Sequence, residues 1–117
     1  MGMHTTLIIQ THTNIFVMEA RKMKRTHPGL ILRMELVEGR ELTISKIAEL
    51  LDTTRSNMSN ILNGRAAVSP NMALRIEAVF GGSAEHLMRL QTAYDFQKAK
   101  EEFLHNPPSL KKFKYVQ

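Results

Sequence analysis

The stretch of this 117-residue chain with the clearest chemistry runs from Thr54 to Gly64. Arginine can pair bidentately with guanine, asparagine with adenine, and serine with either base. Asn and Ser are poor helix formers, so a purely structural surface helix would more naturally carry Glu, Lys or Gln. The residue types therefore favour contact with nucleic-acid bases over a solvated helix. At helical spacing the outward face is wholly polar, with one cation and no acid: Arg55, Ser56, Ser59, Asn60 and Asn63.

Two short helices are predicted to position this face. Thr43 is the expected N-cap of the first helix and Thr54 of the second, while Asp52 stands between them where a left-handed residue is wanted. Two short amphipathic helices joined by a turn of about three or four residues fit the helix-turn-helix motif, whose second helix enters the major groove. The predicted apolar faces are Ile44, Ile47, Ala48 and Leu51 in the first helix, and Met58, Ile61 and Leu62 in the second.

Three further helices are predicted around this pair, which makes the fold all-α. The first runs from Pro28 to Gly39, the fourth begins at Ser69 and Pro70, and the last begins after Ser83 and ends near Phe103. Met34, Met58 and Met72 are interpreted as core residues. The expected core-facing residues are Leu30, Ile31, Met34 and Val37 in the first helix, and Met72, Ala73, Ile76, Val79 and Phe80 in the fourth.

The last helix carries more apolar surface than a small core needs, which predicts a dimer or partner surface. Up to Tyr94, packing against the chain's own first and fourth helices is an equally good interpretation. Beyond Tyr94 a partner surface is favoured. The candidate residues are Leu87, Leu90, Tyr94, Phe96 and Phe103.

The composition suits a single small domain with two basic flanks. The chain has 43% hydrophobic residues, no cysteine and a net charge of +5, of which residues 1–29 and 105–117 each carry +3 and residues 30–104 carry −1. The flanks are available for phosphate contacts, while any specificity has to come from the motif. We predict an arm at 1–25, with one possible strand at Leu7–Ile9 or Ile15–Met18, a domain at 26–104 and a mobile basic tail at 105–117.

Other functional classes find little support. The five histidines lack metal-ligand spacing and are interpreted as surface or capping residues, so neither a metal nor another cofactor is expected. No glycine-rich phosphate loop or nucleophile with a nearby base is present, which argues against an enzyme. No apolar run approaches the ~20 residues that span a bilayer, and no signal-peptide pattern is found. A cytoplasmic protein without membrane contact is expected.

The sequence resembles the Xre-type helix-turn-helix proteins and, within them, the HigA antitoxins of bacterial toxin–antitoxin pairs. The resemblance covers roughly residues 26–97. Asp52 and Thr53 depart from the glycine and aliphatic residue common in the family, and Leu87 replaces a common tryptophan. The motifs that carry the resemblance are His27-Pro28-Gly29, Ile47-Ala48-Glu49-Leu50-Leu51, Arg55-Ser56, Ile61-Leu62-Asn63-Gly64-Arg65, Ser69-Pro70, Met72-Ala73-Leu74-Arg75, Leu90-Gln91 and Ala93-Tyr94-Asp95.

The resemblance implies a five-helix, lambda-repressor-like domain with a long C-terminal helix and flexible termini. It implies a homodimer that binds a palindromic operator in its own promoter on double-stranded DNA, represses its own operon, and neutralises a HigB-like ribonuclease toxin. The residues expected to read bases are Arg55, Ser56, Asn57 and Asn60. The residues expected to contact the DNA backbone are Thr43, Lys46, Thr54, Ser59, Asn63, Gly64 and Arg65.

Two alternatives stay open from the sequence. One is a stand-alone Xre-type regulator without a toxin, which differs only in genomic context. The other is a toxin-binding module whose helix-turn-helix binds DNA weakly and without sequence preference. A mobility-shift assay and the identity of the neighbouring reading frame would distinguish them.

Overall fold

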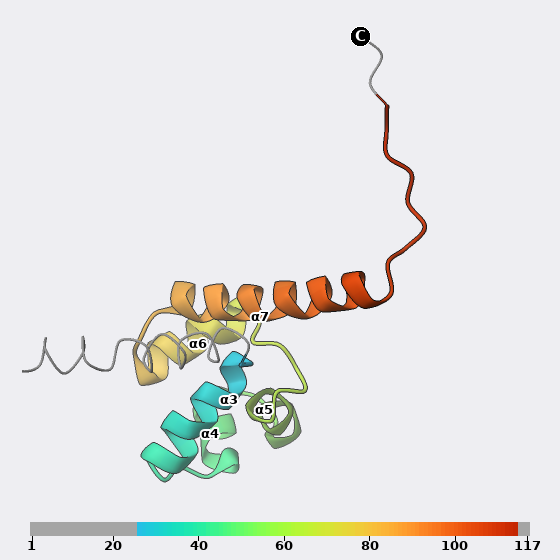
Figure 1. The fold of residues 1–117 in the computed structure, drawn as a ribbon. Helices are drawn as coiled ribbons and strands as arrows, with labels where there is room; N and C mark the ends of the chain where they lie inside the picture. Colours follow the sequence, from blue (N-terminus) through green and yellow to red (C-terminus); the bar gives the residue numbers. More distant parts are fainter. Residues whose placement is uncertain (1–25, 115–117) are drawn as a thin grey trace, which may run out of the picture.

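The computed structural model describes residues 26–114, within which every regular element is helical (Figure 1). α3 continues without a break into the π-helical turns of η1, so the described chain forms five helices, as predicted. The predicted arm at 1–25 and its strand lie outside the described residues. In chain order the elements are α3 (Pro28–Arg33), η1 (Met34–Gly39), α4 (Ile44–Leu50), α5 (Arg55–Leu62), α6 (Pro70–Phe80) and α7 (Ala84–His105).

Four helices begin at the caps that the sequence predicts. In each case a side-chain hydroxyl accepts a hydrogen bond from the backbone N–H three residues further on, which satisfies one of the orphan donors of the first turn. Because these contacts are local, they can be predicted from sequence. The capping residues are Thr43 for α4, Thr54 for α5, Ser69 for α6 and Ser83 for α7.

The turn between α4 and α5 contains the expected left-handed residue, since Asp52 has φ of 54°. The N–H of Asp52 donates to the carbonyl of Glu49 (3.2 Å), and that of Thr53 donates to Ala48 (2.9 Å). A second left-handed residue, Glu41 with φ of 57°, lies between η1 and α4 and was not predicted. The two positions turn the chain sharply on either side of α4.

The core gathers one face from each of the five helices. From the first helix, Leu32 and Leu36 are buried in the core. The core-facing residues predicted for this helix were therefore wrong in part: Met34 is 62% exposed, Leu30 is also exposed, and Ile31 and Val37 are half-buried. Leu32 and Leu36 are four residues apart and share a face, whereas Met34 lies between them on the opposite side. The buried apolar residues are Leu32, Leu36, Ile47, Ala48, Leu51, Met58, Ile61, Leu62, Val68, Met72, Ala73, Ile76 and Ala84.

The last two helices also differ in detail from the prediction. In α6, Met72, Ala73 and Ile76 are buried and Phe80 packs against the core, but Val79 is 44% exposed. α7 reaches His105, two residues beyond the predicted end. Figure 1 shows the first half of α7 lying over the other helices and its second half projecting past them. No helix among residues 26–114 is long and apolar enough to cross a membrane.

Candidate nucleic-acid interface

The polar face of α5 is exposed at its N-terminal end, with Arg55 and Ser56, and half-buried toward its C-terminal end, with Ser59, Asn60 and Asn63. α4 and α5 pack on each other, and the side of α5 that faces the core is closed by Met58, Ile61 and Leu62. Three of the four predicted base-reading residues, Arg55, Ser56 and Asn57, are exposed in the first turn, and Asn60 is half-buried one turn later. The predicted base readers therefore share one accessible surface.

Asn57 is held in place by two local hydrogen bonds. Its backbone N–H donates to Thr54 Oγ1 (3.0 Å), and its side-chain Nδ2 donates to Thr53 Oγ1 (2.9 Å). The carboxamide is thereby oriented before any ligand arrives, which lowers the entropy lost on binding. This geometry suits a side chain that must meet a base edge in a fixed direction.

The C-terminal end of α5 is occupied by contacts within the protein. Asn63 Nδ2 donates to the Ser59 carbonyl (2.8 Å) and to Ser59 Oγ (3.2 Å), and Asn63 Oδ1 accepts from Arg33 Nη1. The N–H groups of Gly64 and Arg65 donate to the carbonyls of Ile61 (3.0 Å) and Asn60 (2.8 Å). A phosphate contact at this end would thus come from the exposed Arg65 side chain.

Gly64 has a structural reason to be glycine. Its φ is +73°, and a Cβ there would stand 3.5 Å from the Cβ of His27. The left-handed conformation lets the chain leave α5 and turn back toward the core. Ser59, Asn63 and Gly64 thus each have a role within the protein. Their contacts with the DNA backbone stay predictions.

The remaining predicted backbone contacts lie on α4 and at the two caps. Thr43 and Thr54 are exposed, and each hydroxyl accepts the capping hydrogen bond of its own helix. Lys46 is exposed and its Nζ lies 3.4 Å from Glu49 Oε1. Exposed ion pairs of this kind contribute little stability, so Lys46 can leave Glu49 for a phosphate at small cost.

Two arginines that the sequence analysis did not select fix this motif from outside. Arg75 of α6 donates from Nη1 to the carbonyls of Leu51 (3.0 Å) and Asp52 (2.9 Å), where α4 ends. Arg33 of α3 donates to Asn63 at the end of α5. Arg75 stands in one of the quoted family motifs, but its acceptors are more than twenty residues away in sequence and could not be inferred.

α7 supports the loop that follows α5. Gln91 is buried, its Oε1 accepts from the N–H of Val68 (2.8 Å), and its Nε2 donates to Asp95 Oδ1 (3.0 Å). The ring of Tyr94 meets that of His27 edge to face, with centroids 5.0 Å apart. These contacts join α7 to the loop before α6 and to the cap of α3.

His27 is a buried cap and not a surface residue. Its Nδ1 accepts from the N–H of Gly29 (2.9 Å), so the capping half of the sequence interpretation is confirmed. Burial lowers the pKa of His27 below its usual value, and the nearby positive charge of Lys98 acts in the same direction. The negative charge of Asp95 and a hydrogen bond with the Ala66 backbone raise the pKa and only partly offset this.

The predicted partner surface divides into two parts. Leu87, Leu90 and Tyr94 are half-buried, and Leu87 packs against the chain's own core. Phe96 and Phe103 are 66% and 52% exposed, on the half of α7 that projects from the domain. Leu104, which the sequence analysis did not select, is exposed beside them. The apolar surface that a partner could cover therefore begins beyond Tyr94.

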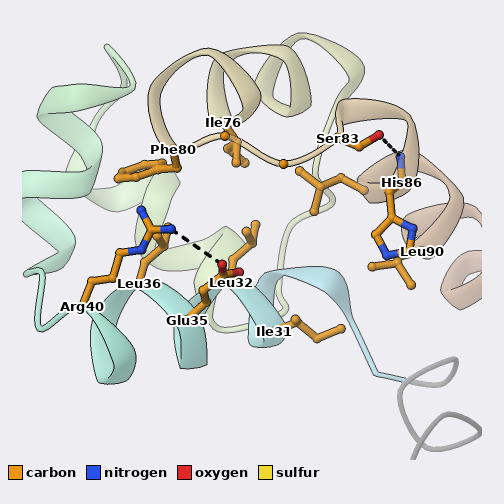
Figure 2. A pocket seen from close by; sticks show the side chains of 13 residues that line it. Ile31, Leu32, Glu35, Leu36, Arg40, Ile76, Phe80, Ser83, His86 and Leu90 are labelled. Atoms are coloured by element: carbon orange, nitrogen blue, oxygen red, sulfur yellow. Dashed lines mark hydrogen bonds and ion pairs between the residues drawn. The ribbon is translucent and has the colours of Figure 1, made fainter. Parts of the chain in front are cut away.

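A cavity of about 480 Å³ lies between η1 and the turn that joins α6 to α7 (Figure 2). Leu32, Leu36 and Ile76 line its apolar interior, and Arg40 stands at its rim, 3.8 Å from Glu35. The exposed residues that are predicted to read bases take no part in its lining. Among residues 26–114 no group of His, Asp and Glu side chains could hold a metal ion.

This arrangement, a capped helix pair with a polar face on its second helix, defines a helix-turn-helix protein. The helix-turn-helix family model matches residues 34–87. Virulence-associated protein A of Dichelobacter nodosus is 41% identical over 75 residues, which cover 62% of this chain and 74% of that protein.

Solved structures point to a narrower group. Antitoxin GraA is 30% identical, with a TM-score of 0.65 over 74% of this chain and 97% of that one. The antitoxin HigA of Pseudomonas aeruginosa, solved with the higBA promoter, is 27% identical, with a TM-score of 0.66 over 69% of this chain and 88% of that one. The chain belongs to the Xre-type helix-turn-helix family of DNA-binding proteins, and its fold is that of the HigA antitoxins. These relatives are regulators and antitoxins, not enzymes.

Proposed function

We propose that the chain is a sequence-specific DNA-binding antitoxin that acts as a homodimer and represses its own operon. The observation that carries the proposal is the exposed face of α5, where Arg55, Ser56 and Asn57 lie together at the end that enters the major groove in this motif. A two-fold symmetric operator with half-sites about one helical turn, ~34 Å, apart fits one such helix from each protomer.

Neutralisation of a HigB-like toxin is the second part of the proposal. It is supported by the likeness to the antitoxins HigA and GraA across about 70% of the chain. The exposed apolar half of α7 offers surface either for a second protomer or for a different protein partner, so by itself it does not favour the toxin. A small basic protein encoded beside this chain is the expected partner.

Operator binding is tested by anisotropy titrations with DNA from upstream of the gene and with a scrambled duplex of the same length. Arg55→Ala should lose about 1–3 kcal/mol of discrimination between the two duplexes, because a bidentate guanine contact is removed. Arg65→Ala should weaken both complexes similarly and reduce the salt slope by about one. Arg89→Ala, which removes an exposed α7 cation that pairs with Glu85, is the matched control.

Unchanged affinity and sequence preference in Arg55→Ala would contradict the base-reading assignment. Toxin neutralisation is tested by expressing the neighbouring reading frame with and without this chain and by purifying the pair. Growth arrest relieved by the chain, together with a stable complex, supports the antitoxin function. Operator binding without either result would instead indicate a stand-alone regulator.

A further inference from the structure

The turn of the helix-turn-helix motif contains no glycine, although it requires a left-handed residue. Asp52 takes this conformation, which is disfavoured for residues with a Cβ. α4 is only seven residues long, and a helix so short needs tertiary support to persist. The angle between α4 and α5 is therefore not secured by local sequence alone.

Arg75 supplies contacts that the turn itself lacks. The N–H groups of Asp52 and Thr53 are already bonded to carbonyls of α4, and Arg75 Nη1 binds the carbonyls of Leu51 and Asp52 at 3.0 and 2.9 Å. One guanidinium nitrogen thus bridges Leu51, the C-cap of α4, and the left-handed residue Asp52. Its positive charge also suits the carbonyl end of a helix.

Arg75 is itself held by a rigid platform. Its neighbours on α6, Met72, Ala73 and Ile76, are buried in the core. The base-reading face begins three residues after Asp52, at Arg55. A shift of the turn relative to α6 would therefore move Arg55 and Asn57 relative to the DNA.

We propose that Arg75 is a positioning residue for DNA recognition, which fixes the direction of α5 by holding the turn and does not itself touch DNA. This inference rests on the proposed function, because it concerns how sequence discrimination is achieved. Removing the two hydrogen bonds should loosen the turn and reduce discrimination while leaving the phosphate contacts in place.

The first test measures amide hydrogen exchange in the free, full-length protein and needs no DNA. In Arg75→Met, the amides of Asp52, Thr53 and Asn57, which are hydrogen-bonded at this turn, should exchange about fivefold to tenfold faster, as expected for the loss of two hydrogen bonds. Those of α3 and the first half of α7 should stay unchanged. Arg75→Lys, which keeps a charged donor, should recover part of the protection, and Arg89→Met should match the wild type.

The second test compares operator and scrambled DNA across a range of salt concentrations. Arg75→Met should lose about tenfold in discrimination, comparable to one bidentate base contact, with an unchanged salt slope. Arg75→Lys should recover part of the discrimination. A salt slope reduced by about one, with discrimination intact, would show that Arg75 contacts a phosphate and would overturn the proposal.

Unchanged exchange at Asp52, Thr53 and Asn57 in Arg75→Met would also overturn the proposal. If the wild-type protein fails to distinguish the two duplexes, the proposed function fails, while the exchange measurement still decides whether Arg75 holds the turn. The two hypotheses are therefore separable.

Discussion

Gly29 lies where α3 approaches the backbone of α5 most closely. A Cβ built on Gly29 would stand 1.8 Å from the carbonyl oxygen of Ile61. Only a residue without a side chain allows the two helices this separation. The position of α5 on the domain is thus set partly by a glycine thirty-two residues earlier in the chain.

Gly29→Ala should consequently destabilise the protein strongly. Because the obstacle is backbone and not a flexible side chain, we expect a loss of roughly 2–4 kcal/mol, toward the upper end of overpacking effects. Urea denaturation followed by circular dichroism measures the change. Gly39→Ala is the control, since its Cβ would meet only the Met34 carbonyl at 3.3 Å and should cost much less. Equal losses in both variants would contradict the close approach of α3 and α5.

His27 should make the stability of the fold depend on acid pH. Its folded-state pKa lies below its ordinary value of 6.5, so the unfolded state binds the proton more readily. The contribution of His27 to the free energy of unfolding should be constant above about pH 6.5. It should fall as the pH is lowered below that value. Protonation would also remove the acceptor for the N–H of Gly29.

Denaturant titrations at pH 7.5, 6.5 and 5.5 test this dependence. His27→Asn keeps a capping acceptor but does not titrate in this range, so it should flatten the decline even though it loses the contact with Tyr94. If the free energy of unfolding of His27→Asn falls with pH as steeply as that of the wild type, another group is responsible for the dependence.

At the scale of elements, the sequence predicts what is local and misses what is distant. The caps Thr43, Thr54 and Ser69 and the left-handed Asp52 follow from contacts within a few residues, and all are found. The prediction of which side of the first helix faces the core was wrong. Leu30 and Met34 are as apolar as Leu32 and Leu36, and only packing distinguishes the two pairs.

The candidate site was likewise predicted where its features are local and missed where its contacts are distant in sequence. The exposure of Arg55 and Ser56 follows from the polar pattern of α5 and was predicted, whereas Ser59, Asn60 and Asn63 of the same predicted face are half-buried. The contacts of Arg33 with Asn63, and of Arg75 with Leu51 and Asp52, span 23 to 30 residues and have no local signal. The contact of Asn63 with the DNA backbone was expected from the family resemblance, which gives no sign that its side chain bonds to Ser59 and Arg33 within the fold.

The loop between α5 and α6 depends on α7 through Gln91. The N–H of Val68 is buried and its acceptor is the Gln91 side chain. Gln91→Met keeps the volume but removes the acceptor, and an unsatisfied buried N–H costs about 1–3 kcal/mol. Thermal and urea unfolding should show this loss, whereas Gln97→Met, on the same helix with a longer bond to Glu101, should change stability by less than about 0.5 kcal/mol. Similar losses in both variants would contradict the role of Gln91.

At the scale of the whole molecule, the two proposed binding surfaces lie on different elements. The proposed DNA-binding face lies on α4 and α5, and the second half of α7 projects past the other helices (Figure 1). That half carries Phe96, Phe103 and Leu104 in exposed positions. Residues 30–104 have a net charge of only −1, so tight binding to two half-sites depends on joining two domains more than on global charge. The proposed homodimer supplies that second domain.

The exposed aromatic residues of α7 should form the contact between protomers. Burying a phenylalanine side chain is worth about 1.5–3 kcal/mol, so Phe96→Ser combined with Phe103→Ser should shift the protein to monomer at concentrations where the wild type is dimeric. Sedimentation velocity measures the mass, and operator titrations should show weaker binding because each half-site is then bound separately. Leu110→Ser replaces an exposed apolar residue in the tail and should leave the mass and the operator affinity unchanged. A double variant that stays dimeric would place the dimer contact elsewhere, and one that becomes monomeric yet keeps toxin binding would separate the two partner surfaces.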